Sequence, residues 1–507
     1  MAESSESSSL LNGSEPEVEI PMEPAIPRTG PEYEPEHGDT HPQEVEEERK
    51  VYDPACFGEA VTVMIHGKIY DITNFDHPGG PDWLKTVAGI DATVHFEVHH
   101  MRIARARTRL ASLPVVGHAE TFWTRPFMGR ICERNWDWNW DDDGFYATLR
   151  RLAAQVLLKE VGYVADSEDD VVNAPKAIWQ RATASTRAMQ VTRIFAVVLF
   201  GFTFALTAIR QSVVAAIASG VLMAVMAGFG HNALHQRGRS WDCWLFDLAG
   251  YDHQEWRMRS HIQHHIAPNM FDDPDTATMA PFVNWRPPLA GGASLCRCVL
   301  SPLAFHVLAG LAVLWMQVNQ LTCPRGGSRS EMRAYLGFLI SITLLMLIGA
   351  SGWFLKAEPE LATLGDDIER CDWVLRAFGL WALMQGVGSF CFILVVFVGH
   401  NQEENWSAEQ DQIRDWGAWQ LATTSDIEIP CGMRRVPLCG MMLFFLHDQT
   451  LHHLFPMIDH SRLHYLRPLV AEVAERFSLE FRPPQSYVKM WLGMLATIAG
   501  VSSVKKA

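Results

Sequence analysis

The sequence predicts a mainly α-helical membrane protein with a small globular domain near its N-terminus and a histidine-rich cap on one side of the membrane. Three observations predict this class. Long apolar runs lie between about residue 190 and residue 400, the stretch from residue 51 has the composition of a small globular domain, and clusters of histidine flank the apolar runs. The chain has 507 residues, 48% of them hydrophobic, which is enough for about two or three domains.

Residues 1–50 are rich in Ser, Glu and Pro and contain no apolar core. They have neither the apolar run of a signal peptide nor the basic, acid-poor composition of an organelle transit peptide. Low hydrophobicity combined with repeated negative charge predicts a disordered acidic tail. The formal net charge of the chain is −16, and no basic stripe indicates a nucleic-acid partner.

A small domain is expected over residues 51–120. It contains the turn His77-Pro78-Gly79-Gly80 and a second segment that runs from Asp91-Ala92-Thr93 to His99-His100. These motifs closely resemble those of the cytochrome b5 family, which has an α+β fold. The resemblance implies a haem b group with His77 and His100 as axial ligands, and His99 is the competing choice for the second ligand. Two axial imidazoles leave the iron no open position for O2, so such a haem carries electrons.

Residues 121–189 are expected to form a connector. Within it, apolar positions recur at helical spacing over residues 145–158. Two interpretations are open for this helix. It can lie along the membrane surface as an amphipathic helix, or it can pack against the protein as an ordinary helix.

Residues 190–500 are expected to form the membrane domain. The segment 194–230 is apolar apart from Arg210, Gln211 and a few hydroxyl groups. As one helix it would be about 55 Å long, nearly twice the roughly 30 Å of a hydrocarbon core. It is therefore predicted to form two spans, at about 194–209 and 212–230, and a second pair is predicted at about 335–355 and 377–399.

The apolar segment 299–318 is also long enough to cross a membrane. If it crossed, His265 and His400 would lie on opposite sides. Arginines flank it on both sides, and the arginine-rich stretch from His231 to Arg333 is predicted to be cytosolic by the positive-inside rule. We therefore expect this helix to lie in the membrane interface, or to dip in and return.

Eight histidines form the candidate metal site. Residues three and four apart share one face of a helix, so each local group can direct its imidazoles at one spot. Imidazole suits iron, zinc and copper, and eight imidazoles are enough for two metal ions, which indicates oxygen chemistry. The candidates are His231, His235, His261, His264, His265, His400, His452 and His453.

Seven of these histidines form boxes that resemble those of the membrane fatty-acid desaturases of the front-end type with a fused cytochrome b5 domain, and His400 lies at the foot of an apolar segment. The boxes read His-x3-His from His231, His-x2-His-His from His261 and Gln-x2-His-His from Gln449, and Asp273-Pro274-Asp275 also fits the pattern. The resemblance implies two iron ions held by the eight histidines, with Gln449 near the metals and its direct ligation open.

The chain departs from the usual pattern of this family at a few positions. Asn232 stands in the first box where Asp is common, and in the third box the usual Asn, Ile and Glu are replaced by His447, Thr450 and Leu451. Changes beside metal ligands can retune a site. They bear on the substrate and the position of the double bond more than on the class of reaction.

The resemblance implies an enzyme that uses O2 to insert a cis double bond between an existing double bond and the carboxyl end of a polyunsaturated acyl chain. The substrate is a fatty-acyl lipid or an acyl-CoA. The chain's own haem supplies electrons, which it receives from an NADH-cytochrome b5 reductase. The expected location is the endoplasmic reticulum membrane, with the haem domain and the histidine boxes in the cytosol.

Other functions fit parts of the same pattern. A lipid hydroxylase or a sphingoid-base desaturase could use the same scaffold. A soluble carboxylate-bridged di-iron enzyme would need repeated Glu-x-x-His motifs, and near these elements only Glu97-x-x-His100 matches, within the haem domain. A non-enzymatic interpretation is a membrane-tethered haem protein that donates electrons to a partner.

Overall fold

The structure of the chain is a computed structural model. The residues that it describes are 51–52, 57–119, 121–122, 138–236, 241–253, 256–257, 261–270, 273–277, 279, 282–283, 285, 295–322, 336–356, 366–406, 412–429 and 436–501. The acidic tail expected at residues 1–50 lies outside them.

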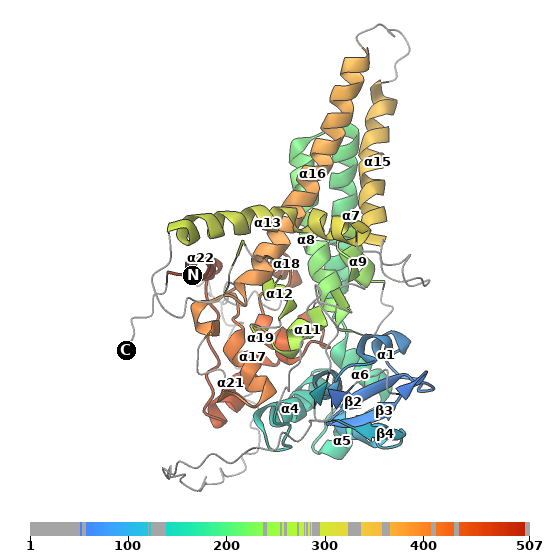
Figure 1. Cartoon of the computed structure of the whole chain (residues 1–507), viewed down its shortest axis with the longest axis vertical. Coiled ribbons are helices and arrows are strands. Elements are labelled where there is room, and N and C mark those ends of the chain that lie inside the picture. Colours follow the sequence, from blue (N-terminus) through green and yellow to red (C-terminus); the bar gives the residue numbers. More distant parts are fainter. Residues whose placement is uncertain are drawn as a thin grey trace, which may run out of the picture. The chain divides into compact units, whose positions relative to one another are not determined.

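The first unit is a small α+β domain (Figure 1). Its antiparallel sheet has the order β2 (Thr62–Ile65), β3 (Lys68–Asp71) and β4 (Val115–His118). His66 and Gly67 join β2 to β3 with φ of 49° and 69°, the left-handed conformation that suits a two-residue hairpin. Three helices pack around the same core, which includes Val63 and Phe96: α1 (Pro81–Val87), α2 (Thr93–His99) and α3 (Ile103–Leu110). The predicted α+β domain is therefore present.

Helix α4 (Phe145–Lys159) is the helix for which two interpretations were open. Its Leu149, Ala153 and Leu157 side chains are fully buried, and the helix packs against α6 (Lys176–Thr183), α17 (Trp416–Thr423) and α21 (Arg467–Arg476). In Figure 1 it lies at the end of the molecule opposite the long helices. It is a packing helix, and the membrane-surface interpretation is wrong.

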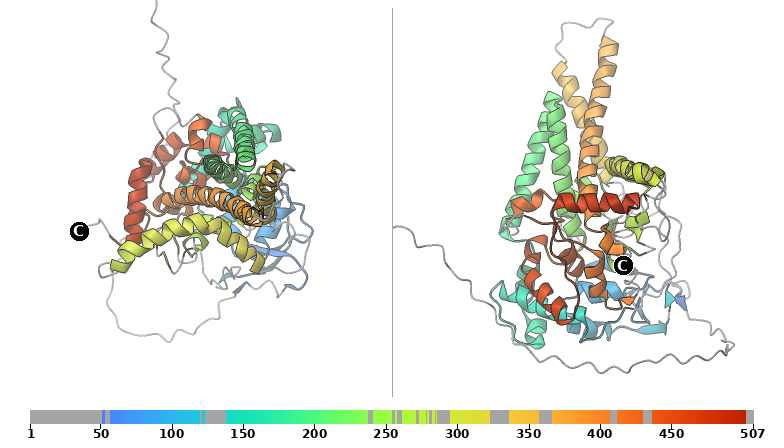
Figure 2. Two further views of the ribbon diagram at one scale, coloured as in Figure 1. Left: turned by 90° about the horizontal axis from the view of Figure 1, so that it is seen from above. Right: turned by 90° about the vertical axis from the view of Figure 1, so that its left-hand side faces the viewer.

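Four long helices stand side by side (Figures 1 and 2). They are α7 (Arg187–Arg210), α8 (Val213–Leu234), α15 (Leu336–Lys356) and α16 (Asp366–Val398). Gln211, at φ 50°, turns the chain between α7 and α8. Among the described residues, the helical segments long and apolar enough to cross a membrane are Arg187–Arg210, Val213–Leu234, Arg297–Val318 and Trp373–Val398.

The third of these segments belongs to α13 (Leu295–Thr322), which lies across the four long helices instead of alongside them (Figure 2). One face of α13, with Phe305, Ala309 and Val313, is fully buried. The opposite face carries an exposed apolar stripe with a helical spacing: Val299, Leu303, Val307, Leu311, Trp315 and Val318. An exposed apolar stripe of this length, on a helix that lies across the bundle, is typical of a helix in the membrane interface.

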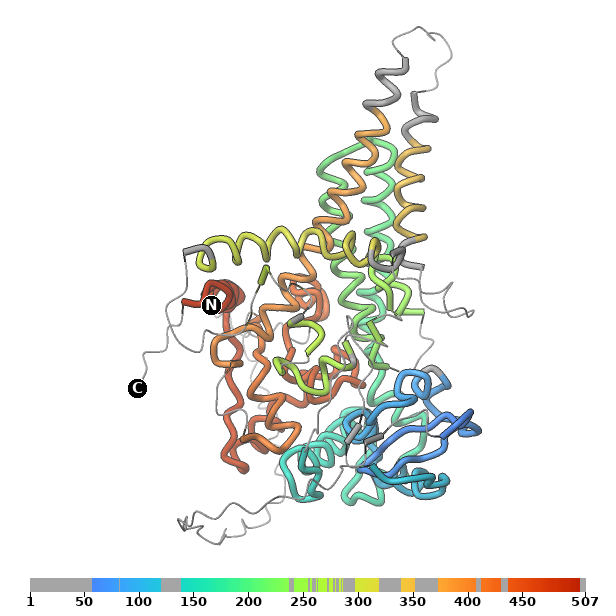
Figure 3. The backbone as a smooth tube through the Cα atoms, in the orientation of Figure 1, coloured from blue at the N-terminus to red at the C-terminus, as the bar shows by residue number. Residues whose placement is uncertain are grey.

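The remaining helices form a cap around one end of α8 and α16 (Figure 3). They are short, and polar side chains from several of them meet at their centre. The cap includes α9 (Cys243–Leu248), α11 (His261–Ile266), α12 (Pro274–Ala277), α17, α19 (Gln449–Leu454), α20 (His460–Leu463) and α21.

Candidate metal and haem sites

The first histidine box lies where α8 ends. His231 is in the last turn of the helix, and His235 is the residue that follows it, still in helical conformation with φ −87° and ψ −13°. Because the two are four residues apart, their rings lie on one face, with centroids 5.7 Å apart. Both side chains are about 1% exposed, so α8 places two imidazoles in a part of the protein that solvent does not reach.

The second and third boxes each divide between two places. His261 and His265, four apart on α11, face each other with their Nε2 atoms 3.1 Å apart. His264 points elsewhere, and its Nε2 lies 3.3 Å from Nε2 of His400 at the foot of α16. On α19 the adjacent His452 and His453 separate in the same way, because consecutive helical residues point about 100° apart.

The eight predicted histidines therefore form two buried clusters. The five-histidine cluster is His231, His235, His261, His265 and His452, and the three-histidine cluster is His264, His400 and His453. In each cluster every histidine offers one ring nitrogen, and these nitrogens lie within 4.8 Å of one another. The clusters touch, since the rings of His265 and His453 stack with centroids 3.9 Å apart. The fold thus brings together histidines that are more than two hundred residues apart in the sequence.

The donor set fits metal ions. Buried imidazole nitrogens normally have hydrogen-bond partners, yet both nitrogens of His235 and of His452 and the Nε2 of His453 have none. Two nitrogens bound to one metal by bonds of roughly 2.1 Å at right angles would lie about 3 Å apart. The Nε2 separations of 3.1 and 3.3 Å match this value.

Burial also sets the protonation state. It lowers the pKa values of six of these histidines well below the usual value, and the neighbouring imidazoles lower them further, so the rings are neutral and can bind a metal. The six are His235, His261, His265, His400, His452 and His453.

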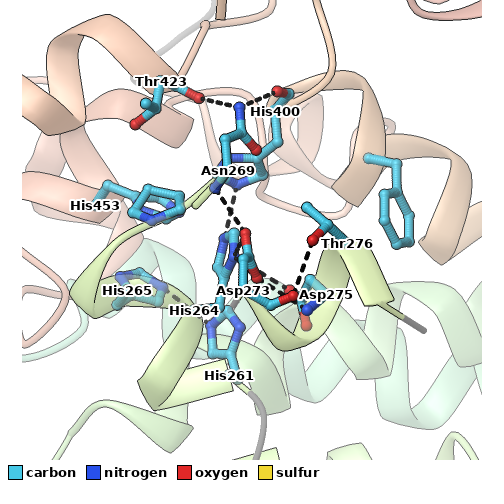
Figure 4. Close-up of polar contacts among 12 residues, drawn as sticks. His261, His264, His265, Asn269, Asp273, Asp275, Thr276, His400, Thr423 and His453 are labelled. Carbon is cyan, nitrogen blue, oxygen red and sulfur yellow. Dashed lines mark hydrogen bonds and ion pairs between the residues drawn. The ribbon is translucent and has the colours of Figure 1, made fainter. Parts of the chain in front are cut away.

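His264 differs because a carboxylate faces it. Its Nδ1 lies 2.9 Å from both oxygens of the buried Asp273 (Figure 4). Burial lowers the pKa of His264, but the charges of Asp273 and Asp275 outweigh it and raise the pKa to about 9. Nδ1–H donates to Asp273, so Nε2 faces the three-histidine cluster, and a metal that binds there would displace the proton that the raised pKa favours; a carboxylate behind the ligand is common in metal sites.

Two further amides fix the same cluster. Asn269 donates from Nδ2 to the backbone oxygens of His400, Asn405 and Thr423, and its backbone N–H donates to Asp273 (Figure 4). Gln420 accepts a 2.9 Å hydrogen bond from Nδ1 of His453. The sequence did not identify either role, because both depend on contacts between elements distant in the chain.

Gln449 lies beside the three-histidine cluster. Its Nε2 is 2.8 Å from Nε2 of His400, and its buried Oε1 has no hydrogen-bond partner. The two ends of an amide are assigned from hydrogen bonding, so half a turn of the group would direct Oε1 at the cluster. Gln449 is therefore placed where it can contact either a metal ligand or a metal.

The sequence did not indicate His460, a buried histidine beside the five-histidine cluster. The ring of His460, on α20, lies 5.1 Å from that of His452 and 6.1 Å from that of His231, between centroids. Burial lowers the pKa of His460 to about 4, and its Nε2 has no partner. The only signal in the sequence was its place shortly after the third box.

In the small domain, His77 faces His100 with ring centroids 6.0 Å apart. Two imidazoles that bind one iron from opposite sides, through bonds of roughly 2 Å, place their centroids about 6 Å apart. His100 Nδ1 donates to the Phe96 carbonyl at 2.8 Å, which leaves Nε2 available as a ligand. His99 points away from this pair, and its ring contacts Trp83 and His235.

Comparisons with known proteins agree with this geometry. The profile of the fatty acid desaturase family matches residues 210–485, more than half of the chain, and that of the cytochrome b5-like heme/steroid binding domain matches residues 47–120. A cytochrome b5-related protein of Drosophila melanogaster is 24% identical over 432 residues, which cover 82% of this chain and 83% of that protein.

Three relatives are named as acyl-lipid desaturases. The acyl-lipid (8-3)-desaturase of Mortierella alpina is 22% identical over 451 residues, covering 83% of this chain and 88% of that protein. The acyl-lipid (7-3)-desaturase of Rebecca salina is 23% identical over 455 residues, covering 86% and 88%. The chain therefore belongs to the fatty acid desaturase family, as an oxygen-dependent di-iron oxidoreductase joined to a haem-binding cytochrome b5-like domain.

Proposed function

We propose that this desaturase is of the front-end type. It inserts a cis double bond between an existing double bond and the carboxyl end of a polyunsaturated acyl chain, carried on a lipid or on coenzyme A. The observation that carries the proposal is the pair of buried histidine clusters beside a haem domain within one chain. The (8-3) and (7-3) acyl-lipid names of two relatives support the position of the new bond.

In this proposal the eight histidines are the iron ligands. The five-histidine cluster holds one iron, and the three-histidine cluster holds the other, with Gln449 beside it. When bound, the iron pair activates O2, which no side chain of the protein can do. Each turnover consumes O2, two electrons and two protons, removes two hydrogens from adjacent methylenes and releases two waters.

The protein's own residues prepare this site. Asp273 and Gln420 hold the rings of His264 and His453 through their Nδ1 atoms, so that their orientation does not depend on the metal. Burial of every histidine in both clusters keeps bulk water from the reacting centre. His77 and His100 bind the haem, and the haem relays electrons from an NADH-cytochrome b5 reductase.

The membrane arrangement is also part of the proposal. Helices α7, α8, α15 and α16 cross the membrane, and α13 lies in its interface. Both histidine clusters then face the same side, because α8 and α16 bring them to the same end of the bundle. The arginine-rich stretch from His231 to Arg333 favours the cytosol as that side. The expected location is the endoplasmic reticulum. In this proposal residues 51–120 are the haem domain, 121–189 the connector and 190–500 the membrane domain.

The test is the fatty-acid profile of yeast that expresses the chain and is fed a panel of polyunsaturated fatty acids. We expect a product with a new double bond on the carboxyl side of an existing one. A His264→Ala variant expressed at the same level should form none. A new bond on the methyl side, a hydroxylated product or a desaturated sphingoid base would refute the front-end assignment. An intact haem with no lipid product of any kind would point to an electron carrier.

A further inference from the structure

We propose that His99 is a positioning residue that bridges the haem site and the five-histidine cluster and keeps the electron path between them continuous. This inference rests on the proposed haem relay, and it names the residue through which electrons pass from the haem site to the five-histidine cluster. The haem ligand His100 and its neighbour His99 are consecutive in the chain, yet their rings face different sites.

The end of α2 causes this divergence. His99 is the last residue of the helix, and His100 follows in an extended conformation with φ −119° and ψ 91°. The ring of His100 lies over Phe96, one turn earlier, and faces His77. The ring of His99 lies over His95, on the adjacent face of the helix. A single peptide bond therefore separates the ring that faces the haem site from the ring that faces the five-histidine cluster.

His99 reaches the five-histidine cluster directly. Its ring is nearly parallel to that of His235, at an interplanar angle of 20° and a centroid separation of 6.3 Å. His99 Nδ1 donates to the carbonyl oxygen of His95 at 3.1 Å, which leaves Nε2 unprotonated, buried and without a hydrogen-bond partner. An unsatisfied buried nitrogen at this point is unexpected for a residue with only a packing role.

Further contacts hold His99 against the cluster. Trp83, from α1 of the haem domain, packs on the His99 ring at 5.0 Å, and the Arg257 guanidinium lies over Trp83 at 5.4 Å. Arg257 also donates to the carbonyl oxygens of Ala233 and Leu234, directly before His235. Arg257 thus connects the haem domain to the helix end that carries the first histidine box.

A buried ion pair fixes the same helix from its other side. Glu97 of α2 is fully buried, and Arg150 of α4 donates to its carboxylate at 2.9 Å and to its backbone oxygen at 2.6 Å. Arg102, just after α2, donates to the backbone oxygens of Val172 and Ala174. With α2 held on two sides, His99 stays in contact with His235 without a separate docking step.

With haem and iron bound, His99 would serve a one-electron step in which the haem iron goes from Fe(II) to Fe(III) and one Fe(III) of the pair is reduced to Fe(II). Two such transfers would supply one turnover. Bonded and closely packed atoms conduct a tunnelling electron better than a gap does. The route from His100 through the peptide bond to His99 and on to His235 has one contact between rings.

The experiment measures haem reoxidation in the full-length chain loaded with haem and iron. The haem is reduced anaerobically, mixed with O2, and followed by its absorption. We expect His99→Leu to slow reoxidation on the order of tenfold, and His99→Phe, which keeps a packed ring, to stay within about threefold of the wild type. The haem spectrum, haem potential and iron content should not change.

His95→Gln, which removes a buried imidazole from the same helix, is the matched control, and its haem should reoxidise at the wild-type rate.

A rate unchanged in His99→Leu, or slowed equally in His95→Gln, would overturn the bridge. So would loss of iron from His99→Leu, because His99 would then be part of the metal site itself. Hydrogen exchange on iron-free chains adds a readout that needs no turnover: α2 should stay protected in His99→Leu, and its exposure would mean that the variant has only undocked the domain. The proposed function can fail while the bridge holds. In that case the wild-type haem would reoxidise only when iron is present, but the chain would make no front-end product. This result would refute the substrate assignment and leave the role of His99 intact.

Discussion

Asn232 lies next to His231, at a position where front-end desaturases commonly have Asp. Its Nδ2 donates a 2.9 Å hydrogen bond to Oδ2 of the buried Asp459. Burial raises the pKa of Asp459, but hydrogen bonds from Ser185 and Ser461 outweigh it and lower the pKa below its ordinary value. A second carboxylate at position 232 would face this charge, which accounts for a neutral amide there.

The Asn232→Asp substitution should therefore destabilise the fold. It replaces a hydrogen bond by the contact of two buried carboxylates, and we expect a loss of about 2 kcal/mol in the free energy of unfolding. Adding Asp459→Asn should restore most of it, because the donor and the acceptor are then exchanged. Thermal unfolding of the two single variants and the double variant forms a complete cycle. If the change in the free energy of unfolding of the double variant equals the sum of the two single changes, positions 232 and 459 are not coupled, which would contradict this explanation of Asn232.

At the scale of elements, α8 and α16 approach closely through glycines. A Cβ at Gly220 of α8 would lie 2.6 Å from the Met384 carbonyl oxygen and 2.8 Å from Cβ of Val387. A Cβ at Gly388 of α16 would lie 3.0 Å from the carbonyl oxygen of Gly220. The two helices carry His231 and, just beyond the end of α16, His400, so their separation sets the spacing of the clusters.

Gly220→Ala should lower the free energy of unfolding by about 1–3 kcal/mol through overpacking. The matched control is Gly201→Ala on α7, where an added Cβ meets no atom within 4 Å. The control should be neutral, or stabilising by about 0.5–1 kcal/mol, because alanine favours a helix. Thermal unfolding in the same detergent compares the two. Equal effects would contradict close packing between α8 and α16.

The junction of α2 and α4 depends on pH through Glu97. Burial alone would raise the pKa of Glu97, but the hydrogen bond with His66 and the charges of Arg150 and Arg107 outweigh it and lower the pKa from 4.5 to about 2. A carboxyl group whose pKa is lower in the folded protein than in the unfolded chain stabilises the fold at every pH above its unfolded-state pKa. This stabilisation is lost as the pH falls toward the folded-state pKa. The stabilisation is therefore complete at pH 7.

Glu97→Gln should cost about 3 kcal/mol at pH 7, the free energy that corresponds to this change in pKa. The difference from the wild type should shrink as the pH falls from about 4.5 toward 2, since the wild-type carboxylate is then protonated too. Denaturation followed by haem absorption measures both curves. A difference that stays constant over this pH range would refute the role of the Glu97 charge.

At the scale of the whole molecule, much of the architecture was predictable. The apolar runs predict the long helices, and the two motifs of the small domain predict its fold. The spacing of the boxes selects seven of the eight histidines that the structure gathers, and the eighth, His400, follows the last predicted span. Local periodicity suffices for these features, because each depends on residues close together in the chain.

The remaining features depend on contacts between distant elements. Sequence could not choose between two environments for α4, since an apolar helical face fits a membrane surface and a protein core equally well. It could not assign His460 to the surroundings of the five-histidine cluster, nor find the contact of His99 with His235. It left His99 and His100 as alternatives because the directions of their rings are set by where α2 ends.

The measurement that tests the central claim most directly is the iron and haem content of the purified full-length chain. We predict one haem b and two non-haem irons per chain, one iron for each histidine cluster. His264→Ala should lose non-haem iron and keep the haem spectrum, whereas His100→Ala should lose the haem and keep the non-haem iron. A wild-type chain that contains haem and no non-haem iron would contradict the account, because the clusters would then hold no metal and the protein would be an electron carrier.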